Sequence, residues 1–218
     1  MQGAWLIVFV VIVSSHLTGQ AVGRISGTVI NEDGQVVEQA DVCTSVTSEG
    51  NTTTSCRIPV DKEGQFQIEN VKFGSYGLSA INEAEGYSIE NQRPGLRVAV
   101  TPKNPSPKVT IRLRPRGAVL TGSIRDKVTG KPVEGAWINY IDIDNGGGGG
   151  AHRIDGRQFV MAAPMDTDLL IYVSANGYQG WVYTDPSNPA RPLVRFASGE
   201  RRVLDIELEP LLKTSAMN

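Results

Sequence analysis

Apolar and polar residues alternate with a period of two along most of the chain after residue 23. Residues 25–29 read ISGTV, residues 109–113 read VTIRL and residues 204–208 read LDIEL, so every second residue is apolar or glycine. This period is typical of β-strands with one face buried and the other in solvent. We find no segment with the 3.6-residue period of an amphipathic helix after residue 23. The pattern therefore predicts an all-β fold.

The same succession of strands occurs twice. Residues 25–42, ISGTVINEDGQVVEQADV, align with residues 120–138, LTGSIRDKVTGKPVEGAWI, when one residue is inserted. Each half contains six or seven short strands separated by Gly, Asn, Asp or Pro, as in an antiparallel sandwich. The sequence thus predicts two tandem antiparallel β-sandwich domains at 24–115 and 117–210, and a flexible tail at 211–218. The short Pro-Arg-Gly junction predicts limited relative motion.

The first residues have a different pattern, that of a secretory signal. Residues 4–13 are an unbroken apolar run, and small residues follow it. Ten residues cover about half of a bilayer core, so a permanent span is disfavoured. We expect a signal peptide at 1–23 with cleavage near 21–23, an exported protein in the periplasm, outside the cell or on its surface, and no stable membrane span afterwards. An uncleaved anchor is the alternative, since no Lys or Arg precedes the run.

Short motifs recur in both halves: a G-x-V/I strand, a glycine turn, a V-x-x-A segment, Q-F before a strand, and A-x-G-Y at 84–87 and 175–178. In this order they resemble the carboxypeptidase regulatory-like domain, a transthyretin-like (prealbumin-like) β-sandwich, in two tandem copies. The resemblance implies Phe66 or Phe159 in the core and an accessory, non-catalytic role. We expect no cofactor. It also implies a fold shared with some carbohydrate-binding modules.

Cys43 and Cys56 are the two cysteines of the chain. If Glu49 and Gly50 are the central residues of a tight hairpin turn, facing positions sum to 99 and the cysteines face each other. A non-hydrogen-bonded pair has a Cα separation of about 4.5 Å, which permits a disulfide. In an exported protein such a pair oxidises, and closing this loop contributes roughly 3 kcal/mol.

Composition and motifs argue against several kinds of function. A net charge of −2 leaves no basic surface for nucleic acid. Of the two histidines, His16 lies in the predicted signal and His152 stands alone, so we expect neither a zinc site nor a catalytic triad, and no enzyme. Asp142 and Asp144 precede a glycine run but lack the other ligands of a calcium loop. We interpret them as the exposed face of a strand that ends in a glycine loop, with no metal.

Aromatic residues are the remaining candidates for binding. Trp137, Tyr140, Tyr178, Trp181 and Tyr183 concentrate in the second half. Alternation separates Trp137 from Tyr140, and the repeated motif favours a core position for Tyr178. Trp181 and Tyr183 should share one side of a strand, either as a ligand-binding pair or as core and sheet-edge packing.

Taken together, these patterns predict a secreted, non-enzymatic, two-domain protein that serves as a binding or spacer module. Its partner would be a carbohydrate or an envelope or extracellular protein. The alternative is a structural, assembly or adhesion protein of the cell envelope that binds another protein through exposed edge strands.

Overall fold

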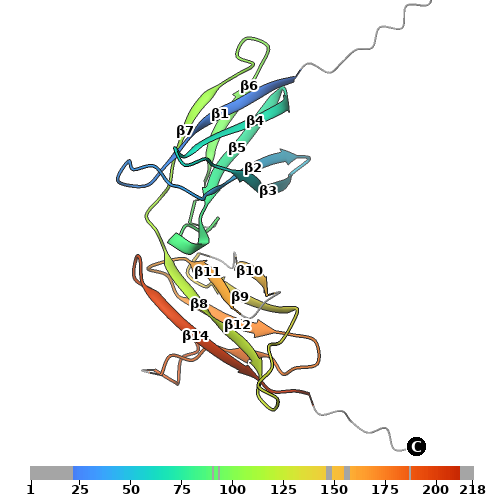
Figure 1. The fold of residues 1–218 in the computed structure, drawn as a ribbon, viewed down its shortest axis with the longest axis vertical. Coiled ribbons are helices and arrows are strands. Elements are labelled where there is room, and N and C mark those ends of the chain that lie inside the picture. Colours follow the sequence, from blue (N-terminus) through green and yellow to red (C-terminus); the bar gives the residue numbers. More distant parts are fainter. Residues whose placement is uncertain are drawn as a thin grey trace, which may run out of the picture.

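The computed structural model of the chain describes residues 22–89, 91–92, 94–145, 158–186 and 188–211, and the backbone of 149–154. Residues 1–21, which hold most of the predicted signal peptide, and residues 212–218 of the predicted tail lie outside the described residues. The described residues form two groups of seven strands that follow each other along the chain (Figure 1). We call them module 1 and module 2.

Module 1 consists of two sheets. Its strands are β1 (Val22–Ile30), β2 (Asp41–Ser48), β3 (Asn51–Pro59), β4 (Gln65–Lys72), β5 (Gly74–Ile81), β6 (Leu96–Val100) and β7 (Lys108–Arg112). One sheet has the order β4-β1-β7 and the other the order β3-β2-β5-β6. Neighbouring strands are antiparallel except β1 and β7, which are parallel.

Module 2 repeats this arrangement. Its strands are β8 (Ala118–Asp126), β9 (Ala136–Asp142), β10 (Gly149–Ile154), β11 (Phe159–Ala163), β12 (Leu169–Ser174), β13 (Trp181–Val182) and β14 (Arg201–Leu208). The sheets have the orders β11-β8-β14 and β10-β9-β12-β13, and β8 and β14 are the parallel pair. The predicted all-β sandwich fold is confirmed.

Each module encloses its own hydrophobic core. Alternation turns Ile25 and Val29 of β1 inward in module 1, and Leu120 and Ile124 of β8 inward in module 2. Phe66 and Phe159, from the repeated Q-F motif, are 5% and 4% exposed, which confirms their predicted core positions. Helix is confined, within the described ranges, to the single 3-10 turn η1 (Glu83–Glu85), and no helix there is long and apolar enough to cross a membrane.

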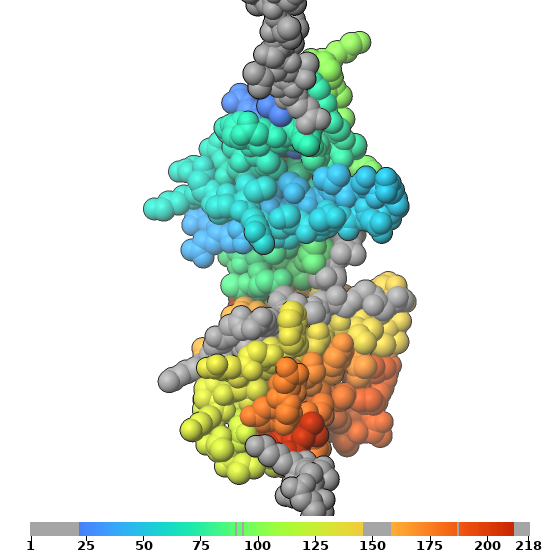
Figure 2. Space-filling view, turned by 90° about the vertical axis from the view of Figure 1, so that its right-hand side faces the viewer, coloured from blue at the N-terminus to red at the C-terminus, as the bar shows by residue number. Residues whose placement is uncertain are grey.

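The two modules touch end to end at a narrow waist (Figure 2). The backbone amide of Gly117 donates to the carbonyl of Gly86 at 2.8 Å. The Glu83 carboxylate, on η1, accepts from the amide of Ala162 in β11. Arg201 donates to the carbonyl of Ala84 at 3.2 Å. The turn η1 of module 1 and the glycine after it are therefore held against the sheet β11-β8-β14 of module 2 by backbone and side-chain hydrogen bonds.

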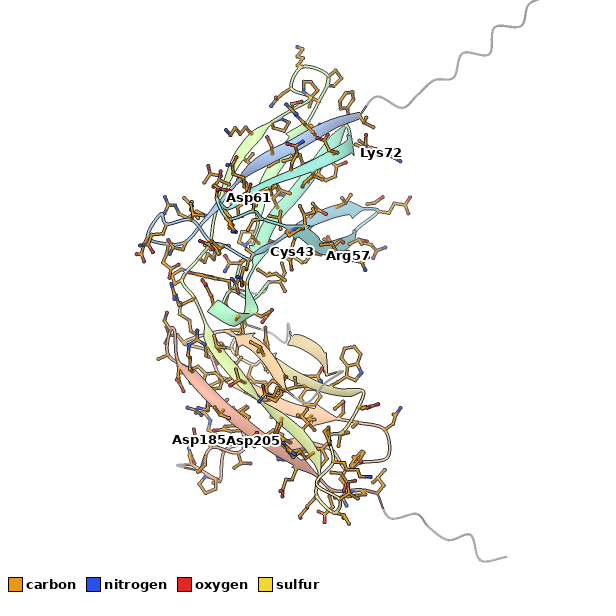
Figure 3. All side chains as sticks on the ribbon, in the orientation of Figure 1. Cys43, Arg57, Asp61, Lys72, Asp185 and Asp205 are labelled. Carbon is orange, nitrogen blue, oxygen red and sulfur yellow. A yellow bond between two sulfur atoms is a disulfide. The ribbon has the colours of Figure 1, made fainter. Side chains whose placement is uncertain are left out.

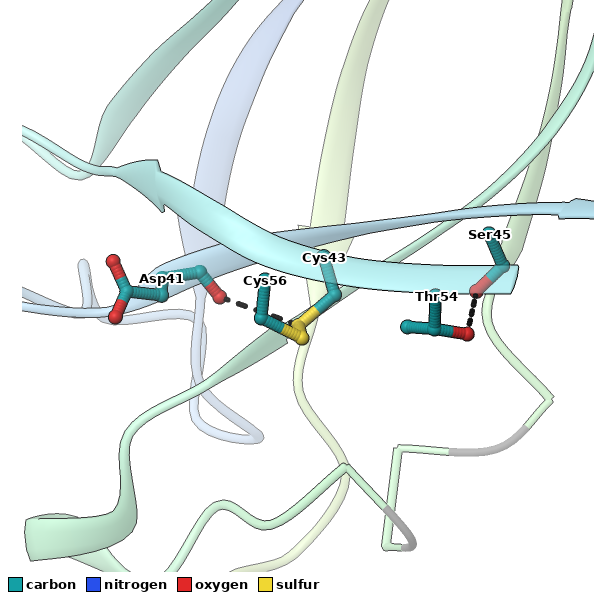
Figure 4. The surroundings of a disulfide bond; sticks show 5 residues. All are labelled: Asp41, Cys43, Ser45, Thr54 and Cys56. Atoms are coloured by element: carbon teal, nitrogen blue, oxygen red, sulfur yellow. Dashed lines mark hydrogen bonds between the residues drawn. A yellow bond between two sulfur atoms is a disulfide. The ribbon is translucent and has the colours of Figure 1, made fainter.

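The hairpin of β2 and β3 has the register that the sequence predicts. Glu49 and Gly50 have φ of 52° and 81°, as a two-residue turn with two left-handed positions requires. Cys43 lies opposite Cys56, and the two form a disulfide with a Cα separation of 3.9 Å, shorter than the expected distance (Figure 4). The predicted disulfide is confirmed.

Two expectations about the end of β9 are wrong. Asp142 is 8% exposed, because it shares the inward parity of Ile138 and Tyr140. Its carboxylate accepts hydrogen bonds from the Thr167 hydroxyl at 2.5 Å and from the Asn145 side chain at 2.7 Å. Burial raises the pKa of the Asp142 carboxyl, but these hydrogen bonds outweigh burial and hold it below its ordinary value.

The glycine run was expected to be entirely a loop. Its last two residues, Gly149 and Gly150, instead begin β10, which pairs with β9. The ladder with β9 satisfies the backbone groups of this segment, and hydrogen bonding of the backbone thus overrides the low strand propensity of glycine.

Candidate binding groove

A groove of about 710 Å³ lies on the outward face of β8 and β14 in module 2. Its lining includes Ser123, Arg125, Gln179, Trp181, Asp205 and Glu207, and we call it the Trp181 groove. Inward residues such as Ile124 and Ile206 fill the core, so the alternate residues of both strands face out. Figure 3 labels Asp205 among them.

The segment before β13 forms the wall of this groove. The Gln179 amide donates to the carbonyl of Glu209 at 2.8 Å, which holds residues 179–181 beside the end of β14. Trp181 is half-buried and packs against the edge of the module 2 core while it lines the groove. Part of the indole is therefore held by contact with the core, and another part is accessible to a ligand in the groove.

Trp181 and Tyr183 are neighbours, with ring centroids 6.2 Å apart and ring planes at 61°. Tyr183 is 8% exposed, however, so its ring offers little surface to a ligand. Its hydroxyl accepts a hydrogen bond from Arg202 at 2.8 Å, and the Arg202 guanidinium lies 4.9 Å from the centroid of Phe196. In this arrangement Tyr183 supports Trp181 from the core side.

Arg202 is the cation that fixes this aromatic group. It forms an ion pair with Glu200 at 2.6 Å and one with Asp185 at 3.4 Å. Burial lowers the pKa of Arg202, but its hydrogen bonds with Glu200 and Tyr183 outweigh burial and raise the pKa above the ordinary value. The guanidinium therefore stays charged and keeps the Tyr183 ring in place.

The polar side of the groove carries both signs of charge. The Ser123 hydroxyl and amide both donate to one Asp205 oxygen, at 2.8 and 3.2 Å. Arg125 donates to the Ser123 hydroxyl at 3.4 Å, and Lys127 forms an ion pair with Glu209 at 3.5 Å. Donors and acceptors alternate along the edge, which suits a neutral ligand rich in hydroxyl groups.

The other aromatic candidates lie elsewhere. Tyr140 is fully buried and Trp137 is 43% exposed, so the two are on opposite faces of β9 as the alternation predicted. Tyr178 is half-buried, packs against the core and donates its hydroxyl to Asp126 at 2.9 Å. The hydrogen bond to Asp126 raises the pKa of Tyr178. None of these three lines the Trp181 groove.

The described part of the chain was searched for clusters of side chains that could ligate a metal ion. There, no group of three or more His, Cys, Asp or Glu side chains is arranged to hold a metal ion. The backbone of His152 lies in β10, opposite Ile138. The loop expected beside this histidine is therefore strand.

Sequence reasoning found Trp181 but missed the polar residues around it. Ser123, Arg125, Asp205 and Glu207 alternate with core residues, so their outward direction could be inferred from parity. Their place beside Trp181 depends on the parallel pairing of β8 with β14 and on the crossing of residues 179–181. No pattern within either segment indicates that contact.

Comparison with known proteins assigns module 1. Residues 24–114 match the profile of the carboxypeptidase regulatory-like domain. Module 1 is a carboxypeptidase regulatory-like domain. The match ends where module 2 begins, so membership of module 2 in this family stays a prediction based on the internal repeat. No curated protein matches this chain.

Several solved structures are distantly similar. The Bacillus anthracis TIE protein is 13% identical over 87% of this chain and 34% of its own, with a TM-score of 0.34, so this chain spans about a third of that protein. Shaft pilin SpaA from Lactobacillus rhamnosus GG is 11% identical over 88% and 98%, with a TM-score of 0.33. Catechol 1,2-dioxygenase from Acinetobacter sp. ADP1 is 14% identical over 44% and 53%, with a TM-score of 0.29. No functional statement about this chain follows from these similarities.

Proposed function

We propose that this chain is an exported, non-enzymatic binding protein whose Trp181 groove holds a neutral carbohydrate. The observation that carries the proposal is a half-buried indole beside a row of alternating hydrogen-bond donors and acceptors. Sugars present C–H faces and hydroxyl edges, which match an aromatic ring and a polar edge respectively.

The hydrogen bonds and ion pairs that the polar groups of the groove already form also agree with a binding role. Asp205 accepts two hydrogen bonds from Ser123, and Glu209 pairs with Lys127, so both carboxylates already stabilise the outward face of β8 and β14. Groups engaged in this way orient a ligand through their remaining lone pairs. Module 1 belongs to a family whose members are accessory domains, which favours binding over catalysis for the pair of modules.

A glycan array tests the proposal with a matched pair of tryptophan variants. The wild-type chain should give signals with neutral glycans, and Trp181→Ala should lose them because the wall of the groove is removed. Trp137→Ala removes an exposed indole from the other sheet and should retain the signals. Signals that survive Trp181→Ala, or no glycan signal with the wild type, would contradict the proposal.

One observation favours a second candidate, an assembly or adhesion protein that binds another protein. β3 is the edge of its sheet, and its residues 51–55 are exposed and uncharged. An edge of this kind can accept an extended segment of a partner protein. Here a pull-down from envelope material should recover one partner with the wild type and not with Thr53→Lys, which places a charge on the edge. Recovery with both forms would exclude the β3 edge.

We further propose that residues 1–23 direct export and are removed near 21–23. The apolar run at 4–13 supports this. N-terminal sequencing of the protein recovered from the producing cells decides it, since a retained Met1 would indicate the uncleaved anchor instead.

A further inference from the structure

Module 1 has a trough of about 580 Å³ on the outward face of the sheet β3-β2-β5-β6. Hydroxyl side chains line it, and we call it the hydroxyl trough; they are Ser45, Thr47, Thr52, Thr54, Ser75 and Ser79. Alternation explains the composition, because Val42 and Leu78 of the same strands face the core.

One row across four strands forms the floor. Thr54, Ser45, Gly77 and Arg97 face each other in register from β3 to β6. The Ser45 and Thr54 hydroxyls are 2.8 Å apart and hydrogen-bonded (Figure 4). Such a pair uses one of its two hydrogens, so one donor and several lone pairs remain for a ligand. Gly77, in the middle of the row, has no side chain and therefore leaves space above the sheet. A Cβ added there would lie 3.3 Å from the Cβ of Ser45.

The wall of the trough is formed by Ile89, Gln92, Pro94 and Gly95. The amide of Gln92 donates to the carbonyl of Ile89 at 3.2 Å, and the Gln92 side-chain oxygen accepts from the amide of Arg114 at 2.8 Å. Gln92 is 5% exposed and lines the trough, yet its side-chain nitrogen has no hydrogen-bond partner among the described residues. This nitrogen is itself buried, so the polar groups that a ligand in the trough can reach are the hydroxyls and Arg97.

The charge of the hydroxyl trough differs from that of the Trp181 groove. Arg97 is exposed at one end of the floor row and forms no ion pair within the described part of the chain. No Asp or Glu is among the described residues that line the trough. A cation and hydroxyl groups together favour a ligand that is negatively charged and rich in hydroxyl groups.

We propose that the hydroxyl trough binds an acidic glycan through its uronic acid carboxylate, with Arg97 as the partner of that carboxylate. The trough lies on the face of the sheet, where the backbone N–H and C=O groups are used in the ladders between strands. An acidic peptide would find backbone partners only at the edges β3 and β6 and not on the floor, whereas sugar hydroxyls match the Ser and Thr side chains of the floor. This site is separate from the Trp181 groove and does not depend on that groove binding anything.

Calorimetric titration with tetragalacturonate and with its methyl ester tests the proposal. The wild-type chain should bind the acid and bind the neutral ester about tenfold or more weakly, since charge-assisted hydrogen bonds are the stronger ones. Arg97→Ala should weaken binding of the acid by a similar factor. Arg57→Ala removes the same charge from an exposed position of β3 outside the lining, and should change binding little.

The proposal would be overturned by no binding of tetragalacturonate, by equal binding of the ester, by equal effects of Arg97→Ala and Arg57→Ala, or by tighter binding of tetraglutamate. The last would indicate an acidic peptide. Trp181→Ala should leave the titration unchanged, so failure here and failure of the proposed function are separately visible. A loss of tetragalacturonate binding in Trp181→Ala would assign the acid to the module 2 groove and contradict the trough.

Discussion

The two A-x-G-Y motifs of this chain build the same local structure in two different surroundings. Tyr87 donates its hydroxyl to Glu32 at 2.8 Å in module 1, and Tyr178 donates to Asp126 at 2.9 Å in module 2. The preceding glycines, with φ of 90° and 84°, each accept a backbone hydrogen bond of 2.8 Å from the chain that leaves the module.

The surroundings of the two tyrosines differ because a second module follows only the first motif within the described residues. Tyr87 is fully buried, and Arg116 from the junction lies 5.6 Å from its ring centroid and 3.6 Å from a Glu32 oxygen. Tyr178 is half-buried and Gly177 is exposed. The motif is therefore part of the sandwich fold itself. Its first copy also contributes to the contact between the modules.

Removing the disulfide should produce the largest difference between the modules. The double variant Cys43→Ser/Cys56→Ser should lose about 3 kcal/mol of unfolding free energy, since a loop of this length is no longer closed in the unfolded chain. The effect should appear in the amide hydrogen exchange of module 1, whereas module 2 contains no cysteine. Equal losses in both modules would mean that the two unfold as one unit.

Alanine at the two motif glycines should give a smaller difference. Both positions have left-handed φ, which costs an alanine about 1 kcal/mol. At Gly86 the new Cβ would also lie 2.7 Å from the carbonyl oxygen of Gly117, whereas at Gly177 nothing lies within 4 Å. We expect Gly86→Ala to lose about 2–3 kcal/mol in urea unfolding and Gly177→Ala about 1 kcal/mol. Equal losses would show that the junction yields easily.

Removing the tyrosine hydroxyl from each motif should give a smaller difference in stability. Tyr87→Phe should lose about 1–2 kcal/mol in urea unfolding, because it leaves the partly buried Glu32 carboxylate without one donor. Tyr178→Phe should lose less, because Tyr178 is only half-buried and Asp126 keeps the hydrogen bonds from the amides of Val128 and Thr129. A larger loss at Tyr178 would reverse the comparison.

The smallest expected effect is a pH dependence at Tyr87. Burial, together with the hydrogen bond to Glu32, raises the pKa of Tyr87 to about 12, from 10.0. A raised pKa stabilises the folded state below the ordinary value, and this contribution disappears as the pH rises from about 10 to 12. Wild type minus Tyr87→Phe unfolding free energy, measured across that window, should fall. A difference that stays constant would mean that Tyr87 ionises freely.

The Glu32 carboxyl should make stability depend on pH in the acid range. Burial raises its pKa, but hydrogen bonds from the backbone and Tyr87 and the charge of Arg116 outweigh burial, so the pKa lies below the ordinary value. Its contribution to stability is present above the ordinary carboxyl pKa and is lost as the pH falls through the lowered value.

Local patterns in the sequence predicted the strands, the hairpin and the disulfide because each of these depends on neighbours in the chain. The position of the Glu49-Gly50 turn alone places Cys43 opposite Cys56. Asp142 has the inward parity of its strand, but the hydroxyl of Thr167, which satisfies the buried carboxylate, comes from a segment 25 residues away that no local pattern indicates. The hydroxyl trough also escaped notice, since its floor row combines residues from four strands.

Candidate binding residues show the same limit. Parity placed Trp181 and Tyr183 on one side of a strand, but their difference in exposure comes from Arg202 and Phe196, which lie farther along the chain. The face of the sheet to which a side chain points follows from the sequence. The exposed fraction of that side chain depends on which residues from other segments pack against it.

The most direct test of the account is an NMR titration of residues 22–218 labelled with ¹⁵N at tryptophan. The indole N–H signals of Trp137 and Trp181 report on the two tryptophans of module 2 separately, and single Trp→Phe variants assign them. On addition of the neutral glycan that gives the strongest array signal, the account predicts that the Trp181 signal shifts while the Trp137 signal stays in place. A shift of Trp137 alone, or binding that moves neither signal, would contradict it.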